Sequence, residues 1–107
     1  MSGRPAEECR DLAQVRVEID RIDNAIVDSI AERLGYVERA WQLKLELGQE
    51  ANVPWRNQQV IDKVRRRASE RGVPADLCEA LWRQMIGWFI QYEEEKLRHQ
   101  IEGKSAG

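Results

Sequence analysis

Three basic residues, Arg16, Arg33 and Lys44, lie on or beside a stripe of apolar residues that has helical spacing. An ordinary core helix carries no cation there. Cations on an apolar face suit a small polyanion such as a dicarboxylate, which they hold through charge-assisted and bidentate hydrogen bonds. The alternative is that the three side chains bury their stems at the edge of the stripe and keep their charged ends in water.

The spacing of these cations predicts how many copies of the chain a site needs. Arg33 and Lys44 are 11 residues apart, so at ~100° per residue they point to within about 20° of each other, roughly 16 Å apart along the axis. Arg16 precedes Arg33 by 17 residues and points about 100° away. One copy cannot bring all three together, whereas an antiparallel second copy can lay its own Arg16 opposite the other two. We therefore expect a homodimer with two equivalent cationic pockets.

The element that carries the cations is a long helix. From Leu12 to Leu45 apolar residues recur every three or four positions, with no Pro and with no Gly before Gly35. Asp11 is placed to cap its start and Gly48 to end it. A helix of this length spans roughly 50 Å, longer than a compact domain of about this size is wide, so one chain cannot bury it alone.

Two shorter helices should follow, giving an all-α fold of three helices per chain in an intertwined homodimer. Asn52 and Pro54 provide a start signal for the second, which Gly72 ends. Its basic residues are interpreted as a solvated outer face. The third begins at Pro74 and carries a wide apolar band, interpreted as dimer core. The 107 residues form one domain, with loosely ordered tails at residues 1–10 and 102–107.

Glu93 is a further candidate for chemistry, because it shares a helix face with Trp82, Met85, Ile86 and Phe89. It should point inward, whereas Glu94 and Glu95 should point to water. In an apolar pocket a carboxyl group tends to stay protonated and can donate a hydrogen bond. The alternative is that Glu93 simply begins a solvated acidic run.

Several classes of function are disfavoured by the composition. A formal charge of −2 is unlike that of general nucleic-acid binders. Neither a signal-like apolar run near the start nor a membrane-spanning stretch occurs, so we expect a cytoplasmic protein without membrane contact. Cys9 and Cys78 should be free thiols, and His99 is the sole histidine, so no metal site is expected. The sequence also lacks a nucleophile beside a base and a glycine-rich phosphate loop.

These residues resemble a known family. The pattern Leu12-x-x-Val15-Arg16-x-x-Ile19-Asp20-x-Ile22-Asp23, followed by Ile30-Ala31-Glu32-Arg33 and Trp41-x-x-Lys44, is similar to that of the all-helical chorismate mutases, and the similarity runs from Cys9 to about Leu97. The lead-in Pro5-x-x-x-Cys9-x-x-Leu12, the Tyr36-Val37 pair and the Ile86-x-Trp88-Phe89-Ile90 segment resemble the isochorismate-pyruvate lyase branch. Members of this family form intertwined three-helix homodimers.

The resemblance implies roles for the cations and for Glu93. Arg16 of the partner chain and Arg33 would clamp the two carboxylates of the substrate. Lys44 would bind a carboxylate and the ether oxygen whose C–O bond breaks. Glu93 would have to be protonated to donate to the same oxygen, so activity should fall as the pH rises and the acid ionises.

The resemblance also points to residues around the substrate ring. Arg56 falls where the family has an arginine near the pocket mouth. Asn57 replaces a glutamate that binds the ring hydroxyl in many mutases, and Phe89 replaces a serine found in some members. Taken alone, Arg56 and Asn57 are equally consistent with surface positions at a helix start.

The implied reaction is the pericyclic rearrangement of chorismate to prephenate, an isomerase activity of aromatic amino acid biosynthesis that needs no cofactor. The 15 residues between Lys44 and Val60, together with Arg56, favour this activity. The first alternative is an isochorismate-pyruvate lyase that makes salicylate and pyruvate. A 4-amino-4-deoxychorismate mutase and a non-catalytic helical dimer module are the others.

Overall fold

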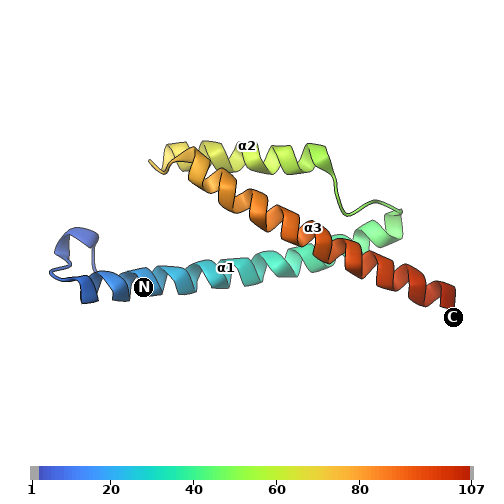
Figure 1. Ribbon diagram of the computed structural model, residues 1–107, viewed down its shortest axis with the longest axis horizontal. Coiled ribbons are helices and arrows are strands. Elements are labelled where there is room, and N and C mark those ends of the chain that lie inside the picture. The colour runs from blue at the N-terminus through green and yellow to red at the C-terminus, as the bar shows by residue number, and fades with distance from the viewer. Residues whose placement is uncertain (1–2, 107) are drawn as a thin grey trace. The chain divides into compact units, whose positions relative to one another are not determined.

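The computed structural model describes residues 3–106 of the chain, with side chains to residue 103. Three α-helices follow one another, α1 (Leu12–Leu47), α2 (Pro54–Glu70) and α3 (Ala75–Ala106), after a short 3₁₀ helix at Ala6–Glu8. No strand occurs among the described residues. The predicted all-helical class and the three helices are confirmed (Figure 1).

Helix α1 begins where the sequence predicts. The Asp11 carboxylate accepts a 2.8 Å hydrogen bond from the backbone N–H of Gln14, and the Gln14 side chain accepts one of 2.8 Å from the N–H of Arg10. These bonds satisfy N–H groups that a helix start would otherwise leave without partners. Asp11 is therefore the N-cap of the helix.

The end of α1 is set by Gly48, which has a positive φ of 66°. The N–H of Gln49 donates to the carbonyl of Lys44 at 2.9 Å, and the N–H of Gly48 donates to the carbonyl of Leu45 at 3.3 Å. This pair of bonds is a Schellman motif, which favours glycine because a Cβ is strained in the left-handed region. The chain thus turns away directly after Leu47, less than one helix turn beyond Lys44.

Helix α2 starts at Pro54, which occupies its first turn, where the missing N–H costs nothing. Its N-cap is Val53, in an extended conformation, and no side chain caps this helix. Asn52 therefore does not act as a cap, although it is part of the predicted start signal. The helix ends at Glu70, and Gly72, whose φ is 71°, follows with a second Schellman bond from Val73 N–H to the Ala68 carbonyl at 2.9 Å.

The structure divides into two compact units, one up to Tyr36 and the other from Val37 onward. In the first unit, α1 has no buried residue; within the whole helix only Trp41, in the second unit, is buried. Most of the exposed large apolar residues of the first unit fall on the predicted stripe: Leu12, Ile19, Ile22, Ile26 and Ile30. This surface is the part of the long helix that a single chain leaves uncovered.

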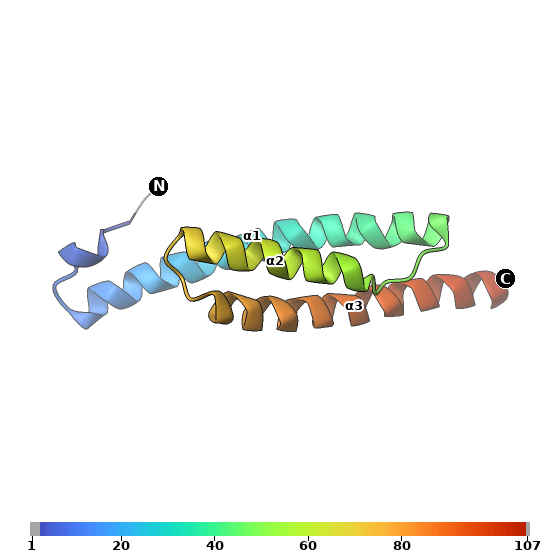
Figure 2. The same ribbon diagram turned by 90° about the horizontal axis from the view of Figure 1, so that it is seen from above.

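In the second unit α2 and α3 lie side by side and run in opposite directions, as both views show (Figures 1 and 2). Ile61, Ala68 and Phe89 are buried in this unit. A second buried cluster joins Trp41 of α1, Ala51 of the following segment and Leu97 of α3. The last turns of α1 are therefore held near the C-terminal half of α3.

Two segments have more regular structure than the sequence predicts. Helix α3 continues to Ala106, past Ile101, because residues from Lys96 to Glu102 favour helices and no proline follows them. The lead-in contains the 3₁₀ turn at Ala6–Glu8, closed by a bond from Cys9 N–H to the Ala6 carbonyl at 3.1 Å. Cys9 and Cys78 are free thiols, as predicted.

An ion-pair network joins α2 to the start of α3. Arg65 donates to Asp76 at 2.9 Å and to Glu79 at 2.8 Å, and Arg83 donates to the other Glu79 oxygen at 2.7 Å. The hydrogen bond from Arg83 is the main cause of a lowered pKa of the Glu79 carboxyl; partial desolvation opposes it, and the bond from Arg65 adds to it. The hydrogen bond to Asp76 is the main cause of a raised pKa of the Arg65 guanidinium, and the hydrogen bond to Glu79 adds to it.

We expect this network to make the fold less stable in acid. Because the folded protein lowers the pKa of Glu79, its contribution is complete above the ordinary value of 4.5 and is lost as the pH falls through the lower folded value. Glu79→Gln should flatten the fall in unfolding free energy between about pH 5 and pH 3. Urea titrations at fixed protein concentration measure the unfolding free energy at each pH.

Glu70→Gln is the matched control, because Glu70 is exposed and its 3.3 Å contact with Arg67 stays within one helix turn. The unfolding free energy of Glu70→Gln should fall with decreasing pH as much as that of the wild type. An equal flattening in both variants would show that the Glu79 network is not its cause.

Candidate active site

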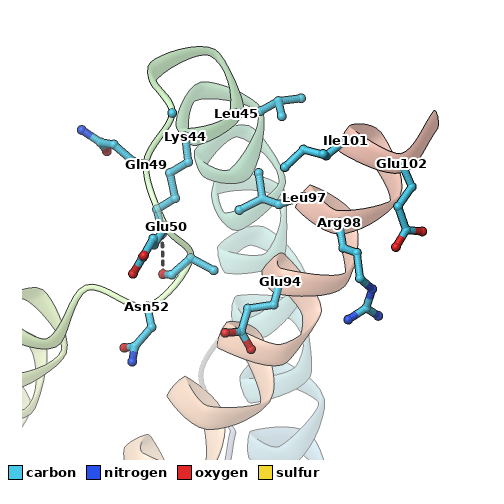
Figure 3. A pocket seen from close by; sticks show the side chains of 12 residues that line it. Lys44, Leu45, Gln49, Glu50, Asn52, Glu94, Leu97, Arg98, Ile101 and Glu102 are labelled. Atoms are coloured by element: carbon cyan, nitrogen blue, oxygen red, sulfur yellow. Dashed lines mark hydrogen bonds between the residues drawn. The ribbon is translucent and has the colours of Figure 1, made fainter. Parts of the chain in front are cut away.

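Lys44 lies in the last turn of α1, and its ammonium group has two acceptors. Its Nζ donates to Glu93 Oε2 of α3 at 2.8 Å and to the carbonyl oxygen of Ala51 at 2.9 Å, the latter bond dashed in Figure 3. The Lys44 side chain is 19% exposed and that of Glu93 9%, so the pair is largely shielded from water. Charge pairs in such surroundings interact more strongly than those at the surface.

Glu93 faces inward, as its helix position predicts, whereas Glu94 and Glu95 are exposed. Its surroundings differ from the apolar pocket that helix periodicity alone suggests, because the Lys44 ammonium contacts its carboxylate. Periodicity within α3 could not reveal this contact, since Lys44 comes from another helix, 49 residues earlier.

Phe89 lies one helix turn before Glu93 and is also buried. Its ring meets that of Trp88 edge to face, with 5.3 Å between centroids. Phe89 thus presents an apolar surface on the helix face that also carries Glu93.

Arg16 and Arg33 belong to the first unit, on α1. The Arg16 side chain is exposed and that of Arg33 is half-buried. Lys44 and Glu93 belong to the second unit. The meeting of the two arginines with Lys44 therefore stays a prediction.

Arg56 and Asn57 lie in the first turn of α2. Arg56 is exposed and donates to Gln59 at 2.6 Å. Asn57 is half-buried, and its Nδ2 donates to Oδ1 of Asn52 at 2.8 Å. In the second unit the structure thus links Lys44 directly to Glu93, and it links Asn57 to the segment that contains Ala51.

A cavity of about 700 Å³ opens between the end of α1, the segment after it and the last turns of α3. Figure 3 shows Leu45, Leu97 and Ile101 close together, with Arg98 and Glu102 pointing away from them on α3. Of the predicted site residues, all of which the structure describes, Lys44 alone lines it. This cavity is therefore not the whole of the predicted substrate pocket.

The backbone carbonyl of Ala51 is a contact that sequence analysis missed. The connection at residues 49–53 is mostly polar and shows no helical periodicity, yet Ala51 is only 6% exposed. A small apolar residue in a polar connection was the available signal. Among the described side chains, no group of three or more His, Cys, Asp or Glu residues is placed to hold a metal ion, and no helix is long and apolar enough to cross a membrane.

Comparison with known proteins finds one matching family and several relatives of similar sequence. The family model for chorismate mutase type II matches residues 15–94. Isochorismate pyruvate lyase of Pseudomonas aeruginosa is 36% identical over 99 residues, which cover 91% of this chain and 94% of that protein. Chorismate mutase of Methanocaldococcus jannaschii is 35% identical over 75 residues, 70% of this chain and 76% of that protein.

A third relative is much longer than this chain. The T-protein of Enterobacter agglomerans is 31% identical over 86 residues, which cover 80% of this chain and 23% of the T-protein. The family model, the two similarly sized relatives and the helical fold agree with one another. The chain belongs to the chorismate mutase type II family.

Proposed function

We propose that this protein rearranges chorismate to prephenate in a cationic pocket shared between two copies of the chain. The observation that carries the proposal is the Lys44 ammonium, which is largely shielded from water and donates a hydrogen bond to Glu93 Oε2. Membership of an isomerase family supports the same reaction. The substrate is a small dicarboxylate, and no cofactor takes part.

The proposed mechanism needs no covalent intermediate. The pocket holds the flexible enolpyruvyl side chain over the ring, which gives a proximity effect. As the C–O bond breaks, negative charge develops on the ether oxygen. Lys44 places a fixed positive charge there, and Glu93 donates a second hydrogen bond when its carboxyl group carries a proton. Arg33 and the partner's Arg16 bind the two carboxylates, while Phe89 forms part of the apolar wall.

Exposed apolar surface supports the homodimer. Ile19, Ile22, Ile26 and Ile30 are between 40% and 52% exposed and follow one another at helical spacing. A contiguous apolar face of this kind usually marks an interaction surface. A second copy of the same helix, lying antiparallel, covers it and contributes Arg16 to the neighbouring pocket.

Isochorismate-pyruvate lyase is the second candidate, since the relative with that name aligns over 94% of its own length. The same cationic pocket would eliminate pyruvate from isochorismate and leave salicylate. At the ring, Arg56 would lie at the pocket mouth, and Asn57 replaces the glutamate that resemblance leads us to expect. Asn57 therefore leaves 4-amino-4-deoxychorismate as a further substrate to test.

The decisive experiment offers the purified protein each substrate separately. Prephenate is followed with chorismate, and salicylate with isochorismate, at equal enzyme concentration. We expect the higher kcat/KM with chorismate. Salicylate formation with the higher kcat/KM would assign the lyase activity instead.

A non-catalytic helical dimer is tested by binding rather than by turnover. A bicyclic dicarboxylate that mimics the transition state should bind in isothermal titration, because transition-state mimics bind much more tightly than substrates. A dimerisation module whose cations are surface charges should give no measurable heat. Absence of both binding and turnover would reject the enzyme hypothesis.

The role of Glu93 predicts a pH dependence. To donate to the ether oxygen the carboxyl group must be protonated, so kcat/KM should fall as the pH rises and the acid ionises. Glu93→Gln should remove this fall, because an amide donates at every pH. The measurement is kcat/KM between about pH 4 and pH 9.

Glu94→Gln is the matched control, since Glu94 is the exposed neighbour of Glu93. Its pH profile should follow that of the wild type. A profile for Glu93→Gln that also matches the wild type would exclude Glu93 as the donor.

A further inference from the structure

The segment that connects α1 to α2, residues 48–53, touches two residues of the proposed site. Gly48, Gln49, Glu50 and Asn52 are exposed, and Ala51 is buried. Five of its residues, 48–52, line the cavity of about 700 Å³. Ala51 is therefore the residue of this segment that packs most closely against the rest of the unit.

Ala51 faces two ways. Its side chain belongs to the buried cluster with Trp41 and Leu97, against which Leu45 and Tyr92 also pack. Its carbonyl oxygen accepts the 2.9 Å hydrogen bond from Lys44 Nζ. Because the residue is held by packing, the acceptor for the ammonium has a fixed position.

Asn52 makes the second contact. Its Oδ1 accepts the 2.8 Å hydrogen bond from Nδ2 of Asn57, at the start of α2. This bond uses one side of the Asn57 amide and thereby orients the other. Two adjacent residues thus each contact one member of the proposed site.

We propose that Ala51 and Asn52 are positioning residues: the Ala51 carbonyl orients the Lys44 ammonium, and the Asn52 amide oxygen orients Asn57. This inference rests on the proposed function. An ammonium group has three N–H donors. Ala51 and Glu93 accept from Lys44 at separate positions, and these two bonds direct the third N–H toward a ligand.

The alternative is that the segment merely closes the connection between two helices. A structural role of that kind predicts a loss of stability without a selective loss of kcat. A positioning role predicts the reverse, because small misplacements of a charged group at a reacting bond slow the chemical step more than they weaken binding. The two roles are therefore separable by experiment.

An ester variant tests Ala51 without changing any side chain. Replacing Asn52 by its α-hydroxy acid turns the amide between residues 51 and 52 into an ester, whose carbonyl is a weaker acceptor. We expect kcat for chorismate to fall by about tenfold, with KM changed less than about threefold. The control is the same replacement at Glu50, which weakens the carbonyl of Gln49 instead.

Asn52 is tested by a pair of variants. Asn52→Ala removes the acceptor and should change the ratio of kcat/KM for chorismate and 4-amino-4-deoxychorismate, which differ at the ring position that Asn57 would face, by about fivefold or more. Asn52→Asp keeps an acceptor for Asn57 and should restore the wild-type ratio. If Asn52→Ala leaves the ratio unchanged, the role of Asn52 is overturned.

A measurement without substrate separates this inference from the proposed function. Hydrogen exchange of the Lys44 ammonium, followed by ¹⁵N NMR, should be faster in the ester at residue 52 than in the wild type or the control. Faster exchange supports the positioning of Lys44 even if the wild type turns over no substrate, a result that would reject the function alone. Exchange and kcat that both match the control would overturn the role of Ala51 and leave the function standing.

Discussion

Lys44→Ala is expected to lower kcat for chorismate by a factor of about 10³. Lys44 contacts Glu93 directly, and the resemblance assigns Lys44 to the oxygen of the breaking bond. Removal of one preorganised donor from a developing negative charge typically costs a factor of about 10² to 10³ in kcat, and a full positive charge lies at the upper end. Steady-state kinetics with saturating chorismate measure the loss.

A control must separate lost chemistry from lost stability. Lys44→Ala leaves the Glu93 carboxylate shielded from water without its cation, and breaking a buried pair in this way destabilises a protein by about 3–5 kcal/mol. The double variant Lys44→Met/Glu93→Gln removes both charges and should melt close to the wild type. It should nevertheless be inactive.

Circular dichroism and sedimentation measure whether each variant keeps the helical content and the assembly state of the wild type. An unaltered kcat in Lys44→Ala would remove Lys44 from the mechanism. An active double variant would show that neither charge of the pair takes part in the chemical step.

Mixing two inactive variants should restore activity. In the proposed dimer each pocket combines Lys44 of one chain with Arg16 of its partner. A heterodimer of Arg16→Ala and Lys44→Ala chains therefore contains one pocket with both residues intact and one with neither. Random exchange of equal amounts should give about a quarter of the wild-type activity, since half of the dimers are mixed and half of their pockets are intact.

The chain that carries both substitutions is the control. Mixed with wild type, it should form heterodimers with no intact pocket, so the activity should fall below that expected from dilution. If the two single variants stay inactive after chain exchange, which sedimentation of differently tagged chains verifies, Arg16 acts within its own chain or not at all.

Local signals explain why much of the fold was predictable. Asp11 has the side chain that a helix start needs, and Gly48 and Gly72 take the positive φ that ends α1 and α2. The inward direction of Glu93 follows from the period of its own helix. Each of these features depends on residues within a few positions, so the sequence alone carries the information.

Contacts between distant elements were less accessible. The pairing of Lys44 with Glu93 depends on how α1 lies against α3, which helix periodicity does not determine. The acceptor on Ala51 is a backbone atom that every residue type possesses, so residue identity could not reveal it. An asparagine before a helix predicts a side-chain cap, but the Asn52 side chain accepts a hydrogen bond from Asn57 and does not cap α2.

Helix α1 buries no side chain before Trp41 within its own chain. Folding of residues 12–36 is consequently an event of second order in protein concentration under the proposed assembly. The thermal midpoint should therefore rise with each tenfold increase in concentration. On dilution, the specific activity and the helical content should decrease together. An excess of inactive subunits should lower the activity further, because active subunits then form mixed dimers.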